Sequence, residues 1–138
     1  MGFLIDTCVW IDIERGVLAA ADVAGITGEE AVYLSPITIA ELKFGAEIAS
    51  AAGLRSQRLS ALARLRRKPL LMIDDETGEI FGLLAAQLKA AGRALRHRVQ
   101  DLWLASQAIQ HAYPLVTRNR KDFVDIPGLN LVTYALKR

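Results

Sequence analysis

The chain of 138 residues has the size of one domain and can bury roughly two-thirds of its unfolded surface. Hydrophobic residues make up 52% of it, which argues against disorder, and no apolar run approaches the length of a membrane span. The net charge of +2 is unevenly distributed, because residues 1–50 contain eight acidic and two basic residues, whereas residues 51–138 contain seven acidic and fifteen basic residues. This asymmetry predicts a polyanionic or acidic partner.

The first residues contain no basic leader, and the only cysteine, Cys8, excludes an intramolecular disulfide. Both observations are typical of a protein of the reducing cytoplasm. We therefore expect a cytoplasmic location and no membrane attachment.

The first predicted strand, residues 3–5, leads directly to Asp6, and a helix is predicted over residues 9–14. Ligands of open α/β sheets bind at the carboxyl edge, where such a strand ends. A bare carboxylate is costly to bury between two apolar segments. Asp6 must therefore be paired, protonated or bound to a metal ion.

Residues 31–34 form the second predicted strand, and Ser35 and Pro36 follow as the N-cap and first position of a helix. This helix is predicted to continue to about residue 50. Within it Glu41 lies on an apolar stripe with three- and four-residue spacing, which we expect to face the core. The other members of the stripe are Ile37, Phe44, Gly45 and Ile48.

The middle of the chain contains a basic amphipathic helix, predicted over residues 54–68, and a third predicted strand at residues 70–73. The acidic stretch 74–77 favours the start of another helix, because carboxylates interact favourably with a helix N-terminus. Gly92 favours its end.

A basic loop over residues 93–98 leads to a helix predicted over residues 99–112. Asp101 shares one face of this helix with Leu104, Ala105, Ala108 and Ala112, so a second carboxylate lies on an apolar stripe.

Residues 114–117 form a fourth predicted strand, with a polar turn over residues 118–123 at its carboxyl end, and residues 129–132 form the last strand. Strands that alternate with helices predict an α/β fold with right-handed crossovers. We expect a central parallel sheet of about four or five strands, flanked by helices, in a single domain over residues 1–138.

Four acidic side chains are predicted to converge at one edge of this sheet, namely Asp6, Glu41, Asp101 and Asp122. Carboxylates held close together repel one another, and a divalent cation relieves that repulsion. Oxygen ligands without a cluster of Cys or His favour Mg²⁺ or Mn²⁺, and one or two such ions could activate water for attack on a phosphodiester.

The same residues carry a family resemblance that extends over nearly the whole chain. The segments 4–7, 35–45, 101–105, 115–123 and 126–129 resemble, in this order, the PIN-domain ribonucleases, and they are most similar to the VapC-type toxins of bacterial toxin–antitoxin pairs. Cys8 departs from this pattern, because the family more often has Asn or Ser at that position.

The resemblance implies a PIN-like fold and a metal-dependent endoribonuclease whose catalytic, metal-binding quartet is Asp6, Glu41, Asp101 and Asp122. It implies that Thr7, Thr117 and Asn119 support the metal ions or the scissile phosphate, although Thr117 and Asn119 could simply end a strand and form a turn. It also implies products with 5′-phosphate and 3′-hydroxyl ends, a homodimer, and inhibition by a cognate VapB-type antitoxin.

The RNA-binding residues are predicted from charge alone. Arg93, Arg96 and Arg98 precede Asp101 closely and are candidates for contact with RNA phosphates. The arginines of residues 54–68 are expected to face solvent or the antitoxin.

Two alternatives remain open at the level of the sequence. A phosphatase with an aspartyl-phosphate intermediate also has an Asp after its first strand, but it needs a second Asp where Cys8 lies. A catalytically silent PIN-like module that binds RNA or protein would retain the fold without turnover.

Overall fold

The computed structural model describes residues 1–136, in which the strands form one parallel sheet in the order β2-β1-β3-β4. The central strands are β1 (Gly2–Ile5) and β3 (Leu115–Thr117), and the edge strands are β2 (Ala31–Tyr33) and β4 (Leu131–Thr133). The predicted α/β fold with a parallel sheet of about four strands is therefore confirmed.

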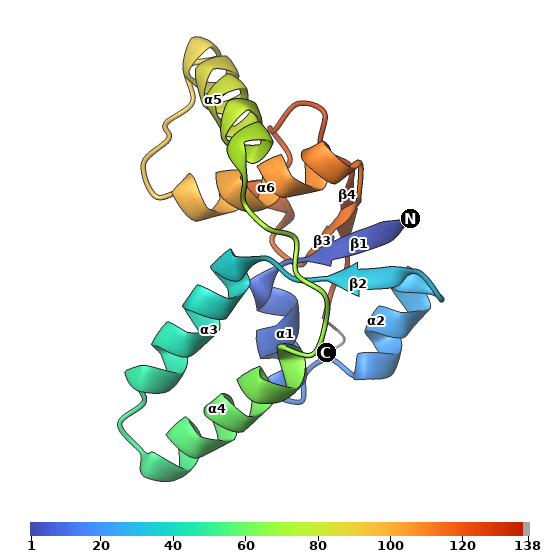
Figure 1. Cartoon of the computed structure of the whole chain (residues 1–138), viewed down its shortest axis with the longest axis vertical. Helices are drawn as coiled ribbons and strands as arrows, with labels where there is room; N and C mark the ends of the chain where they lie inside the picture. Colours follow the sequence, from blue (N-terminus) through green and yellow to red (C-terminus); the bar gives the residue numbers. More distant parts are fainter. Residues whose placement is uncertain (137–138) are drawn as a thin grey trace.

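Helices connect the strands and cover both faces of the sheet (Figure 1). Two helices, α1 (Thr7–Glu14) and α2 (Ala20–Thr27), join β1 to β2. Four more join β2 to β3, and these are α3 (Pro36–Glu47), α4 (Ala52–Leu65), α5 (Asp75–Ala90) and α6 (Val99–His111). In Figure 1, α3 and α4 form a hairpin that extends away from the sheet, on the opposite side of the molecule from α5.

The hydrophobic core has one cluster on each face of the sheet, because successive side chains of a strand point to opposite faces. Leu4 and Leu115 are fully buried against α5 and α6, whereas the next residues, Ile5 and Val116, are buried against α1 and α2. Both central strands are thus apolar on both faces, as parallel strands covered by helices require.

The predicted strand at residues 70–73 is wrong as a strand. Only a single parallel bridge forms there, between Leu34 and Leu70. The next residue, Leu71, points its side chain into the core, and its carbonyl accepts a hydrogen bond of 2.6 Å from the Gln107 side chain of α6. The ladder stops here because the neighbouring chain turns into α3 at Ser35, and its next residue, Pro36, has no N–H to donate.

The expectation that the whole stripe around Glu41 faces the core is also wrong. Phe44 is 65% exposed and Ile48 is 63% exposed. The C-terminal half of α3 lies in the projecting hairpin, beyond the sheet that it would have to cover (Figure 1). On α6, by contrast, Leu104, Ala105 and Ala108 are fully buried as predicted.

Helix boundaries differ from the predictions by a few residues, with α1 beginning at Thr7 where a start at residue 9 was predicted. The cause is the side chain of Asp6, whose Oδ1 accepts a hydrogen bond of 2.7 Å from the backbone N–H of Thr7. Helix α3 starts where predicted, with Ser35 as N-cap and Pro36 as its first residue. No helix among residues 1–136 is long and apolar enough to cross a membrane.

We expect Ser35→Ala to lower the free energy of unfolding by about 1 kcal/mol, the usual cost of losing an N-cap. The Ser35 Oγ is buried and accepts a hydrogen bond of 3.1 Å from the N–H of Ile37. Urea unfolding followed by circular dichroism measures the change, and Ser60→Ala on the exposed face of α4 is the control. Equal unfolding midpoints for Ser35→Ala and wild type would contradict the capping role.

Candidate active site

Asp6 lies at the carboxyl end of β1, where the sheet meets the first turn of α1. It is 6% exposed, and its two carboxylate oxygens have different partners. Oδ1 caps α1, and Oδ2 accepts a hydrogen bond of 2.8 Å from the hydroxyl of Thr117 at the end of β3. Burial raises the pKa of Asp6, and the hydrogen bonds from Thr117 and Thr7 offset part of that rise.

Glu41 reaches the same region from α3 through a threonine contact. The Thr7 hydroxyl lies 3.1 Å from Glu41 Oε1 and 2.9 Å from the hydroxyl of Thr38. Partial burial raises the pKa of Glu41, and the negative charge of Asp6 raises it further. Thr7 therefore stands between two predicted site carboxylates, as expected of a supporting residue.

Asp101 is in the first turn of α6, and its environment is the clearest sign that the predicted quartet converges. Burial, followed by the negative charges of Asp6, Asp122 and Glu41, raises the pKa of Asp101 from 3.8 to about 7. Charges act on one another strongly only at short range in a solvated protein. The four predicted carboxylates therefore lie within range of one another's charge.

Asp122 is the last residue of a short 3-10 helix, Arg120–Asp122, labelled η1, which follows β3. The backbone leads there through Asn119, whose N–H donates a hydrogen bond of 3.0 Å to the Thr117 hydroxyl. Thr117 thus links Asp6 to the start of the turn that carries Asp122. The contact made by Asn119 comes from its backbone.

The thiol of Cys8 lies at the edge of the site. Its sulfur is 3.5 Å from Asp6 Oδ2 and 3.5 Å from the Thr117 hydroxyl, and the residue is partly buried. Burial and then the charge of Asp6 raise the pKa of the thiol, so the group is held neutral. A neutral thiol is a weak hydrogen-bond donor and competes little with Thr117 for Asp6.

The donor set fits a divalent cation chemically. Carboxylate oxygens are the ligands that Mg²⁺ and Mn²⁺ prefer, and the pKa values of Asp6, Glu41 and Asp101 are raised chiefly by burial and further by the negative charge of neighbouring acids. Among residues 1–136, however, no three His, Cys, Asp or Glu side chains are grouped closely enough to form a ready cage for an ion.

The three predicted RNA-binding arginines have different environments. Arg96 is exposed. Arg93 is 61% exposed at its side chain and lies 3.9 Å from Asp125, whereas Arg98 forms a tight ion pair with Asp125 and has a side chain that is only 18% exposed. Asp125 was not predicted from the sequence, because an acid after a turn carries no periodic signal.

Comparison with known proteins agrees with this fold. The family model described as PIN domain matches residues 3–129. Ribonuclease VapC5 of Mycobacterium tuberculosis is 33% identical over 125 residues, which are 91% of this chain and 87% of that protein. The chain therefore belongs to the PIN-domain family and, within it, to the VapC proteins, which confirms the resemblance found in the sequence.

Solved structures give the same result. The chain is similar to VapBC-1 from nontypeable Haemophilus influenzae, with 26% identity, a TM-score of 0.80 and coverage of 96% of this chain and 98% of that one. It is also similar to VapBC-5 from Mycobacterium tuberculosis, a member of the VapBC family of toxin–antitoxin systems, with 25% identity, a TM-score of 0.77 and the same coverage, 96% and 98%.

The raised pKa of Asp101 predicts how stability depends on pH in the metal-free protein. Between pH 3.8 and about 7 the folded state binds more protons than the unfolded chain, so the free energy of unfolding falls as pH rises through this window. Asp101→Asn removes the ionisable group and therefore this loss of stability at high pH. At pH 8 in chelator we expect the variant to exceed wild type by on the order of 1 kcal/mol, a reduced figure because water screens part of the carboxylate.

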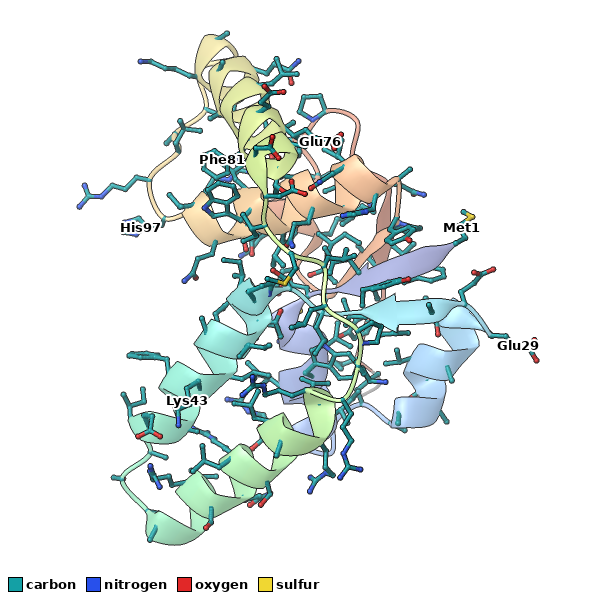
Figure 2. All side chains as sticks on the ribbon, viewed as in Figure 1. Met1, Glu29, Lys43, Glu76, Phe81 and His97 are labelled. Carbon is teal, nitrogen blue, oxygen red and sulfur yellow. The ribbon has the colours of Figure 1, made fainter. Side chains whose placement is uncertain are left out.

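Urea unfolding at pH 8 and pH 5 measures this difference, which should shrink at the lower pH. Glu29→Gln, an exposed acid in the turn before β2 (Figure 2), is the control and should show neither effect. A variant less stable than wild type at pH 8 would contradict charge repulsion at Asp101.

Proposed function

We propose that this chain is a metal-dependent endoribonuclease of the VapC type, formed by a single domain over residues 1–138 and acting in the cytoplasm. The observation that carries the proposal is the pKa of Asp101, raised to about 7 by burial and by three neighbouring carboxylates. Carboxylates with strongly raised pKa values are typical of functional sites, because an uncharged residue at such a position would make the fold more stable. The relative named Ribonuclease VapC5 supports RNA as the substrate.

Asp6, Glu41, Asp101 and Asp122 would hold the cation, for which Mg²⁺ or Mn²⁺ is the best match to oxygen ligands. When bound, a divalent cation lowers the pKa of water and neutralises charge on a phosphodiester. The protein's own contribution is orientation. The Thr117 hydroxyl fixes Asp6 Oδ2, and capping of α1 fixes Oδ1, so this carboxylate has little freedom to turn.

Basic residues around the acidic site would bind the RNA backbone. Arg96 is exposed in the loop that leads to α6, and Arg120 and Lys121 are exposed in η1 beside Asp122. Their positive charges compensate the repulsion that a phosphate backbone meets near four carboxylates, and they attract polyanions at long range. We expect the cleaved RNA to carry 5′-phosphate and 3′-hydroxyl ends, as the family resemblance implies.

The regulatory partner would be a VapB-type antitoxin that binds beside the site. A groove between α1, α3 and α4 has mixed apolar and charged walls that include Trp10, Leu42, Arg58 and Leu62, and Glu41 of the quartet also lines it. A peptide in this groove would therefore reach the carboxylates. The similar structures of VapBC complexes support a partner of this kind.

Homodimer formation is also proposed, and light scattering of the purified chain tests it.

The central test is RNA cleavage by purified, partner-free protein. We expect Mg²⁺- or Mn²⁺-dependent cutting into discrete fragments, and at least roughly a hundredfold loss in Asp6→Asn, because removing a principal electrostatic group from an active site has effects of this size. Denaturing gels with added metal or excess chelator measure it, with Glu29→Gln as the control.

Full activity in folded Asp6→Asn would contradict the assigned site. If the folded, metal-loaded wild type binds RNA and cuts none, the protein is instead a catalytically silent binding module.

Arg96→Ala should weaken RNA binding and reduce its salt dependence. One lost phosphate contact lowers the slope of log K against log salt by about 0.7 for a single strand. Fluorescence anisotropy with the Asp6→Asn protein as background measures binding without cleavage. Arg67→Ala, at an exposed position just after α4, is the matched control. An unchanged slope for Arg96→Ala would exclude a phosphate contact.

A further inference from the structure

Arg98 and Asp125 form the tightest ion pair near the site. The two terminal nitrogens of Arg98 donate to the two carboxylate oxygens of Asp125, at 2.8 Å and 2.6 Å. The same guanidinium donates a third hydrogen bond, of 3.0 Å, to the backbone carbonyl of Asp122. Both side chains are more than four-fifths buried, with exposed fractions of 18% and 19%. This forked geometry is the strongest and most directional form of ion pair.

The pair connects two segments that each carry a carboxylate of the quartet. Arg98 is the residue directly before α6, and Asp101 follows it by three residues in the first turn of that helix. Asp125 follows η1, and Asp122 precedes it by three residues at the end of that turn. Each carboxylate is thus about one helical turn from one partner of the ion pair.

The backbone directly before Arg98 has an uncommon conformation. His97 has φ +67°, a left-handed conformation that is unfavourable for a residue with a side chain. Figure 2 shows His97 in the loop that precedes α6, and its side chain is exposed and holds nothing in place. Strained residues of this kind persist where their surroundings determine the conformation. The next residue, Arg98, is held by the forked contact with Asp125.

The charge of Arg98 is largely neutralised where it lies. Arg98 holds the pKa of Asp125 below its ordinary value, which shows that the two charges are paired. For Asp101 the attraction to Arg98 is outweighed by burial and by the three neighbouring carboxylates. A paired and mostly buried guanidinium is also poorly placed for a phosphate contact, in contrast to the exposed Arg96.

We propose that Arg98 and Asp125 are positioning residues that fix the separation of Asp101 and Asp122, so that both carboxylates can hold one divalent cation. Arg98 then contributes no contact to RNA. The inference rests on the proposed function, because it takes Asp101 and Asp122 as cation ligands. It assigns a role to Asp125, which lies outside the predicted quartet.

The test is Mn²⁺ binding without RNA, measured by calorimetry for wild type, Arg98→Ala, Asp125→Ala and the double variant. Each single change should weaken Mn²⁺ binding about tenfold, the low end of the range for residues that orient metal ligands. The double variant should be no weaker than either single one, because both changes break the same contact. Glu47→Ala, which removes the exposed pair with Arg55 at 2.9 Å, is the matched control and should leave binding unchanged.

RNA binding separates this role from a phosphate contact. If Arg98 and Asp125 only position the carboxylates, Arg98→Ala and Asp125→Ala should bind RNA with the same salt dependence as wild type. If Arg98 contacted RNA instead, Arg98→Ala would reduce the salt slope, and Asp125→Ala would strengthen binding by freeing the guanidinium. That opposite pair of effects would overturn the proposal.

Two further variants keep the test valid if the alanine variants fold poorly. Arg98→Lys retains the charge but loses the fork, and we expect it to weaken Mn²⁺ binding as well. The exchanged pair, Arg98→Asp with Asp125→Arg, should recover part of the affinity that Arg98→Asp alone loses. Wild-type Mn²⁺ affinity in folded Arg98→Lys and Arg98→Ala would refute the positioning role alone, whereas a wild type that binds no Mn²⁺ would refute the proposed function.

Discussion

Repulsion among carboxylates at one sheet edge is the constraint on which the site depends. Asp6 is buried where β1 ends, between the two hydrophobic clusters, and the pKa of Asp101 is raised to about 7 by burial and then by the charges of Asp6, Asp122 and Glu41. The fold tolerates this cost because apolar burial on both faces of β1 and β3 holds the edge in place. A bound cation would neutralise this repulsion, so the unrelieved repulsion favours cation binding.

Much of the fold could be predicted, and the four acids of the candidate site could be singled out, because the relevant signals are local. Apolar residues before Asp6 and before Thr117 identified the two central strands, and Ser35 with Pro36 identified the start of α3. The parallel arrangement of strands then brings their carboxyl ends to one edge, so the convergence of residues distant in sequence followed from topology. Asp101 was recognisable because a carboxylate on a buried helix face is unusual.

The features that the sequence did not reveal depend on tertiary contacts. Residues 70–73 have a strand-like composition, but the chain beside them turns into α3 at Ser35 and Pro36, and Gln107 instead donates to the carbonyl of Leu71. Spacing alone could not distinguish an apolar stripe that faces the core from one that projects with α3, so Phe44 and Ile48 were misplaced. Arg98 was grouped with its exposed neighbours because its partner, Asp125, is 27 residues away in the chain.

The most direct test of the account is a crystal structure of the partner-free protein with saturating Mn²⁺, using the anomalous scattering of the metal. The account predicts an anomalous peak coordinated by Asp101 and at least one other carboxylate of the quartet, with the Arg98–Asp125 pair intact beside it. Absence of a peak there, or a peak bound only elsewhere on the molecule, would contradict the claim that these carboxylates form a cation site.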